Sequence, residues 1–134
     1  MKSINLLPVI LFITLAVLFH SCSSDDTAEP NIPGADRDKY VGSWICTETY
    51  SGQAPTSFTI NVQKHGEDDT LYVYNFNNLG SPFYAIWLVS GNSVTIPSQN
   101  VSGFSISGSG FYVNEKINLT YNSGGYQITA VCSQ

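Results

Sequence analysis

The chain has 134 residues, a length that suits one domain and leaves no room for two independent cores. Only 11% of the residues are charged, but the long apolar run is confined to residues 4–19, so most of the chain has the composition of a water-exposed protein. Without residues 1–21 the chain has four Lys and Arg against ten Asp and Glu, a net charge of −6. This balance argues against nucleic acid as a partner.

The N-terminus has the layout of a secretory signal peptide. Lys2 is followed by the apolar residues 4–19, and the small residue Ser21 precedes Cys22. A membrane-spanning helix needs about 20 apolar residues, so a permanent anchor is the weaker interpretation. The end of the run resembles the lipobox of bacterial lipoproteins, which implies a signal peptide over residues 1–21 and a diacylglycerol on Cys22. An ordinary signal peptide followed by a free thiol is the alternative.

Residues 22–39 are expected to form a lipidated, flexible tether that joins the domain to the lipid bilayer through acylated Cys22. Residues 23–39 hold two prolines and seven charges but almost no apolar side chains, so they cannot offset the entropy of ordering. The acidic stretch at residues 23–26 is similar to the export tag of Bacteroidetes-type surface lipoproteins. That similarity implies the outer membrane, with the domain facing the cell exterior; a merely solvated linker is the alternative.

Residues 40–134 have the pattern of an all-β domain. Short runs of β-branched and aromatic residues alternate with Gly, Asn and Ser, and no apolar repeat of helical spacing extends over ten positions. Because the connections are short, successive strands should pair as antiparallel neighbours in a meander. The predicted strands are 42–50, 57–63, 70–76, 83–89, 93–96, 101–106, 110–114, 116–121 and 126–132.

Eight or nine strands in a meander form either two packed sheets or a closed barrel. We expect the barrel, because closure removes the exposed edges. Cys46 and Cys132 lie in the first and the last predicted strand, and they remain as an even pair once Cys22 is lipidated. A disulfide between them would join the first strand to the last; two buried free thiols are the alternative.

The first predicted strand opens with Gly42, Ser43 and Trp44, and this Gly-x-Trp element resembles the first-strand motif of lipocalins and other calycins. The resemblance implies a lipocalin-like barrel of eight strands, with Trp44 packed across its closed end. Residues 93–121 also look like the lipocalin-like domains of small Bacteroidetes-type lipoproteins. A second lipocalin motif is missing and the domain is shorter than typical lipocalins, which argues against a large ligand cup.

An eight-stranded barrel is just wide enough for its own side chains or for one small ligand. The first functional hypothesis is a non-enzymatic lipoprotein that binds a small hydrophobic or amphipathic molecule inside the barrel. A packed interior filled by the same apolar side chains is the alternative. The expected ligand-binding residues are aromatic: Phe58, Phe83, Trp87 and Phe111.

A second set of aromatic residues is predicted on a surface of the barrel. Aromatic rings with an uncharged polar surround suit sugar stacking or a protein contact. The second functional hypothesis is therefore a packed barrel that serves as a glycan- or protein-binding accessory subunit, although tyrosines at a barrel rim would give the same pattern. The patch consists of Tyr72, Tyr74, Phe76 and Tyr84.

The sequence contains no motif typical of a nucleophilic enzyme, a phosphate-binding loop or a zinc site. His65 lies close to the carboxylates of residues 67–69, and this pattern indicates a solvated hairpin turn more than a metal site. Glu48 and Glu115 are the only carboxylates in or beside predicted strands, and a glycosidase-like pair would need them roughly 5 to 10 Å apart. We therefore expect no enzymatic activity, metal or cofactor.

Overall fold

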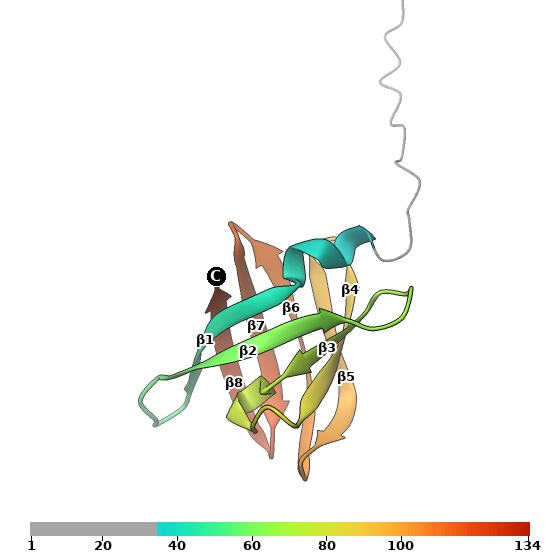
Figure 1. Cartoon of the computed structure of the whole chain (residues 1–134). Coiled ribbons are helices and arrows are strands. Elements are labelled where there is room, and N and C mark those ends of the chain that lie inside the picture. Colours follow the sequence, from blue (N-terminus) through green and yellow to red (C-terminus); the bar gives the residue numbers. More distant parts are fainter. Residues whose placement is uncertain (1–34) are drawn as a thin grey trace, which may run out of the picture.

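The computed structural model describes residues 35–134, so the predicted signal peptide, Cys22 and most of the predicted tether lie outside the described residues. The described residues form an all-β, closed antiparallel barrel of eight strands, each paired with its neighbours in chain order (Figure 1). The elements are η1 (Ala35–Tyr40), β1 (Gly42–Tyr50), β2 (Thr56–Lys64), β3 (Thr70–Tyr74), η2 (Phe76–Asn78), β4 (Tyr84–Ser90), β5 (Ser93–Val101), β6 (Phe104–Val113), β7 (Lys116–Ser123) and β8 (Tyr126–Ser133). Within this part of the chain no helix is long and apolar enough to span a bilayer.

The barrel closes between its first and last strands. β1 pairs with β8 in a register that places Cys46 directly opposite Cys132, and the two cysteines form a disulfide. The bond joins residues 86 positions apart, for which the chain-entropy model gives a stabilisation on the order of 4 kcal/mol. The predicted link between the first strand and the last is confirmed.

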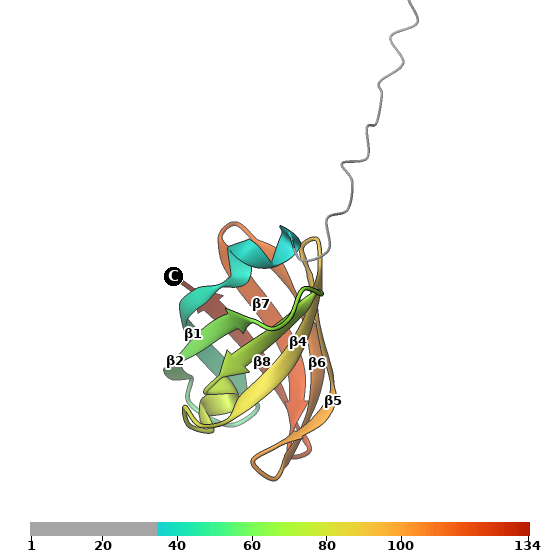
Figure 2. The same ribbon diagram turned by 45° about the vertical axis from the view of Figure 1, so that its right-hand side comes forward.

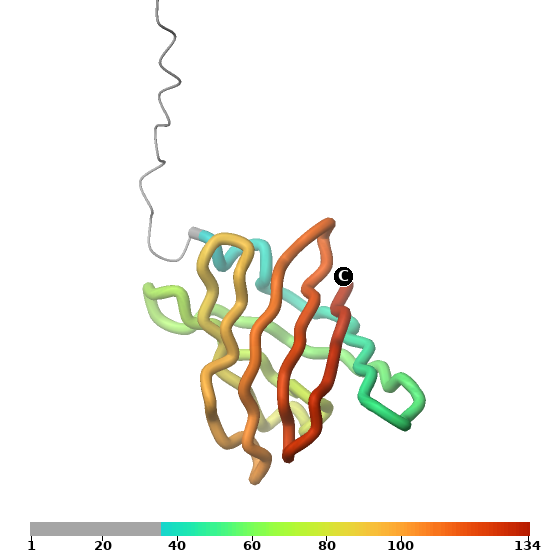
Figure 3. Tube along the Cα trace, turned by 180° about the vertical axis from the view of Figure 1, so that it is seen from behind, coloured from blue at the N-terminus to red at the C-terminus, as the bar shows by residue number. Residues whose placement is uncertain are grey.

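The strands alternate between an inner and an outer face, as their sequences predict. In β2 the side chains of Ile60 and Val62 are buried, whereas Thr59 and Gln63 are exposed. Figure 3 shows the four strands β5 to β8 side by side on the far side of the barrel. Large, fully buried side chains from several strands and from both 3-10 helices fill the interior; they include Tyr40, Trp44, Phe76, Trp87 and Tyr121.

Nine predicted strands become eight because two predicted turns are wrong. Residues 97–100 lie within β5 and residues 107–109 lie within β6, while the chain reverses at Ser102 and Gly103 between them. A turn was predicted at residues 97–100 because Pro97 cannot donate a hydrogen bond to a neighbouring strand. The register of β5 against β6 shifts just after Ile96.

The strand continues past Pro97 because a side chain replaces the missing backbone pair. The amide of Gln99 accepts a hydrogen bond from the backbone N–H of Ile86 at 2.7 Å and donates one to its carbonyl oxygen at 2.8 Å. β5 therefore stays attached to β4 beyond the point where their backbone pairing ends.

The second wrong turn was predicted at residues 107–109. Gly108 and Gly110 of β6 do not form a turn; they allow β7 to approach β6 closely. A Cβ atom at Gly110 would lie 2.2 Å from the carbonyl oxygen of Asn118, and one at Gly108 would lie 2.4 Å from that of Thr120. β7 therefore passes β6 at a distance that only glycine allows.

η1 covers one end of the barrel, which we call the closed end (Figures 1 and 2). Arg37 is buried, and its guanidinium donates hydrogen bonds at 3.0 to 3.1 Å to the carbonyl oxygens of His65, Gly66 and Thr70. The carboxylate of Asp36 accepts a hydrogen bond from the backbone N–H of Gly91 at 2.7 Å. Residues 35–39, which their charge placed in the tether, therefore belong to the folded domain, because the loops of the barrel supply partners for those charges.

Candidate functional site

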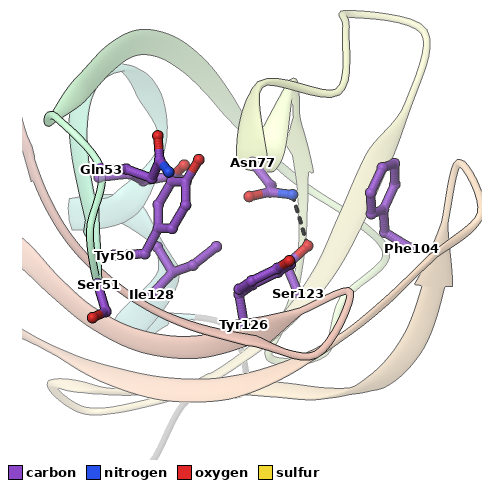
Figure 4. Close-up of a pocket in the computed structure, with 9 residues that line it drawn as sticks. Tyr50, Ser51, Gln53, Asn77, Phe104, Ser123, Tyr126 and Ile128 are labelled. Atoms are coloured by element: carbon purple, nitrogen blue, oxygen red, sulfur yellow. Dashed lines mark hydrogen bonds between the residues drawn. The ribbon is translucent and has the colours of Figure 1, made fainter.

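The end of the barrel opposite η1, which we call the open end, contains a pocket of about 380 Å³. Its walls come from β1 and the connection to β2, from η2, from the start of β6 and from the β7–β8 hairpin. Figure 4 shows Tyr50 and Gln53 on one side of the space, with Asn77 and Phe104 on the other. The pocket is lined by Glu48, Tyr50, Ser51, Gln53, Asn77, Phe104, Ser123, Tyr126 and Ile128.

Glu48 is the buried charged group of this pocket. Its side chain is only 7% exposed, and its Oε1 atom accepts a hydrogen bond from the Tyr121 hydroxyl. Its Oε2 atom accepts no hydrogen bond from residues 35–134. Burial raises the pKa of the Glu48 carboxyl, against the opposing effect of the Tyr121 hydrogen bond. Burial and the neighbouring Glu48 raise the pKa of Tyr121, which therefore stays a neutral phenol.

A chain of hydrogen bonds connects Glu48 to other lining residues of the pocket. The Tyr121 oxygen lies 3.0 Å from Oδ1 of Asn77, and Nδ2 of Asn77 donates to the Ser123 hydroxyl at 2.8 Å. A phenol has a single proton, so Tyr121 donates either to Glu48 or to Asn77. When Glu48 is ionised, Tyr121 donates to the carboxylate. When Glu48 is protonated, the carboxyl donates to Tyr121 and frees the phenol proton for Asn77.

η2 presents Asn77 to the pocket by means of an unusual backbone. Asn75, Asn77 and Asn78 have φ angles of 58°, 56° and 54°, in the left-handed region that asparagine tolerates better than most residues. The Asn75 side chain holds the turn by donating to the Thr59 carbonyl and accepting from the Gly80 N–H, each at 2.8 Å. The sequence predicted a turn here, but it did not reveal that Asn77 would also line a pocket.

Charge is distributed unequally between the two ends of the barrel. Among residues 35–134, every Lys, Arg, Asp and Glu other than Glu48 lies in η1, at the β2–β3 connection or at the β6–β7 hairpin, all at the closed end. Several of these groups pair with one another or with loops; Lys64, for example, forms an ion pair with Asp38. The open end therefore has one carboxyl group and no basic side chain from the described part of the chain.

The four aromatic residues predicted to bind a ligand do not form one site, and none of them lines the pocket at the open end. Trp87 is fully buried in the core, and Phe58 is half-buried against it. Phe83 is 42% exposed before the start of β4, and Phe111 is 61% exposed on the outer face of β6. The expectation that all four rings line one internal site is wrong, because Gly110 and not Phe111 faces inward in β6 and Phe83 lies exposed outside the strand.

Three of the four predicted patch residues do lie together on the outside of the barrel. The rings of Tyr72 and Tyr84 stack with centroids 4.2 Å apart, and Tyr74 lies 5.5 Å from Tyr84. His65 stacks on Tyr72 at 4.1 Å, so Tyr72 lies between two rings, His65 on one side and Tyr84 on the other, and has no free face for a sugar. Phe76 is only 2% exposed; its assignment to the patch is wrong, because it follows the end of β3 and turns into the barrel.

Trp44 lies buried beneath η1, at the closed end of the barrel. It is 1% exposed, its Nε1 atom donates to the Tyr40 carbonyl oxygen at 2.7 Å, and the ring of Tyr112 stands edge-on to it at 6.3 Å. Gly42 has a φ of 127°, a conformation that strains any residue with a side chain. Both residues therefore help to build the closed end.

The carboxylate pair considered for a glycosidase does not form. Glu48 faces the open end, whereas Glu115 lies in the β6–β7 hairpin at the closed end. No three His, Cys, Asp or Glu side chains among residues 35–134 are grouped so that they could hold a metal ion.

Glu48 could have been found as a pocket residue from the sequence. Trp44, Cys46 and Glu48 occupy alternate positions of one strand, so the alternation that buries the first two also directs Glu48 inward. Tyr50 and Tyr126 continue the inward alternation of β1 and β8, but the sequence does not show that these strand ends, far apart in the chain, meet at one pocket.

The closed antiparallel barrel of eight strands is compatible with a lipocalin-like fold. No protein-family model matches the chain, and no curated protein and no solved structure matches it.

Proposed function

We propose that the protein is a non-enzymatic, lipid-anchored binding module of the outer membrane, and that its lipocalin-like barrel holds a small amphipathic molecule at the open end. The observation that carries this proposal is the pocket itself. Tyr50, Tyr126 and Phe104 give it aromatic walls, while Asn77 and Ser123 offer hydrogen-bonding groups. Small-ligand sites combine these two features, an apolar lining and a few placed polar groups.

The pocket at the open end is a better candidate than the barrel interior. Trp44, Trp87 and Phe76 already occupy the interior. It is also a better candidate than the patch of Tyr72, Tyr74 and Tyr84 on the outside of the barrel, where the rings of Tyr72 and Tyr84 stack on one another. Since η1 is the first described element and lies at the closed end, the chain enters the barrel away from the pocket (Figure 1). That arrangement suits a domain tethered through Cys22 with its binding site turned outward.

Mass spectrometry of small molecules extracted from the natively purified protein tests the function. We expect a bound molecule in extracts of the wild type, at several-fold lower occupancy in Tyr126→Ala, because this side chain forms one wall of the pocket and is 67% exposed. Phe111→Ala is the matched control, since it removes an equally exposed ring outside the pocket. Equal occupancy in all three proteins, or an extract without any bound molecule, would contradict the proposal.

A further inference from the structure

We propose that the ligand of the pocket carries an organic ammonium group, and that this group pairs with the carboxylate of Glu48. The inference rests on the proposed function and names the chemical class of the ligand. It follows from three observations: a buried carboxyl group without a counter-charge, aromatic walls close to it, and the absence of basic side chains from the described lining.

The first observation concerns the electrostatic balance of Glu48. A buried carboxylate is costly unless it is paired with a cation or protonated, and a single phenol donor does not replace a cation. Within residues 35–134 only Tyr121 donates to this group; Oε2 has no donor from these residues and is not among the fully buried atoms that lack a partner, so it is open to the pocket. A cationic group brought by a ligand would replace water at Oε2 and supply the missing counter-charge.

The second observation concerns the walls around the carboxyl group. The rings of Tyr50 and Tyr126 lie 6.1 Å apart and are tilted by 52° to each other, and Phe104 lines the same pocket. Aromatic faces attract ammonium groups within about 6 Å, and the attraction is stronger where water is displaced. Rings beside a carboxylate form a site that favours a cation over a neutral molecule of the same shape.

The third observation limits the class of ligand further. An anionic ligand would meet Glu48 with no basic side chain from the described chain to offset the repulsion. A volume of about 380 Å³ is near the lower end of the roughly 300 to 1,000 Å³ that is typical of ligand sites, so the bound part is small. A choline-sized or arylalkylamine-sized group fits these limits.

Binding of a cation should be linked to the protonation of Glu48. Burial raises the pKa of this carboxyl, so a proton competes with the ammonium group at a higher pH than it would at an exposed glutamate. The other titratable groups facing the site are phenols: Tyr50 on the same strand, Tyr121 from β7 and Tyr126 from β8. Affinity for a permanent cation should therefore fall as the pH falls, and binding should release protons near the pKa of Glu48.

Calorimetric titration of the full chain with choline and with its neutral analogue 3,3-dimethylbutan-1-ol tests the inference. Choline keeps its charge at every pH, so any pH dependence belongs to the protein. We expect the wild type to bind choline at least tenfold more tightly than the alcohol. Glu48→Gln should bring the ratio of the choline affinity to the alcohol affinity close to one. Glu115→Gln, which changes a carboxylate at the closed end, should retain the preference.

Equal affinities for the two probes, a preference that survives in Glu48→Gln, or failure of choline to bind would overturn the inference. If Glu48→Gln does not fold, Tyr126→Leu provides the test. This variant keeps apolar bulk but removes the aromatic face, so it should lower the ratio of the choline affinity to the alcohol affinity several-fold. A neutral molecule extracted in a Tyr126-dependent manner would contradict the ammonium inference while the proposed function stands. No Tyr126-dependent ligand of any kind would contradict both.

Discussion

The two ends of the barrel differ in how completely their charged side chains are paired. At the closed end, Arg37 is satisfied by three carbonyl oxygens, Lys64 pairs with Asp38, and Lys39 donates to Asn92 at 2.7 Å. At the open end, Glu48 is buried with a single phenol as donor. The same short chain therefore gives its buried cation at least three acceptors, and its buried anion a single donor. Incomplete pairing of this kind is more typical of a binding site than of a structural one.

The largest expected effect on stability comes from a substitution at the closed end. Arg37→Met should lower the free energy of unfolding by about 3 kcal/mol, because three carbonyl oxygens lose a charged donor while the side chain stays buried. Urea denaturation followed by tryptophan fluorescence measures the change. Lys116→Met, which removes an exposed cation at the same end, should change stability by no more than about 0.5 kcal/mol. A similar small effect for both variants would show that η1 is not held by Arg37.

A smaller effect on stability is expected from a substitution at the open end. Glu48→Gln should change stability at neutral pH by no more than about 1 kcal/mol, because the amide oxygen still accepts from Tyr121. Since burial raises the folded-state pKa of Glu48, its ionisation opposes folding. Wild-type stability relative to Glu48→Gln should therefore be highest below the unfolded-state pKa and should decline as the pH rises through the folded-state pKa. Denaturation at several pH values checks this; a difference independent of pH would contradict it.

The fold could be predicted from the sequence because the patterns that indicate strands are local and repeat along the chain. The alternation of Ile60 and Val62 with polar neighbours identified a strand, and one cysteine in each terminal strand indicated the closure. The errors occurred where one residue type serves two purposes. Gly108 and Gly110 look like turn residues, yet they allow β7 to pass close to β6.

The pocket was harder to predict because it is assembled from segments that only the closed barrel brings together. Its walls include Tyr50, Phe104 and Tyr126, which continue the inward alternation of β1, β6 and β8. Alternation predicts the face of each residue, but it does not show that these strand ends meet around one space. Glu48 differs from them because a carboxyl group at an inward position is unusual. The predicted aromatic site failed because Phe111 lies on the outer face of β6 and Phe83 is exposed before β4, so neither of them faces the interior with Trp87.

The most direct test of the account is a ¹³C NMR titration of the Glu48 side-chain carboxyl, with and without choline. An incompletely paired, buried carboxyl group should titrate above the ordinary range of glutamate in the free protein, and choline should lower that pKa. An ordinary pKa that choline leaves unchanged would show that Glu48 is neither electrostatically strained nor part of a cation site.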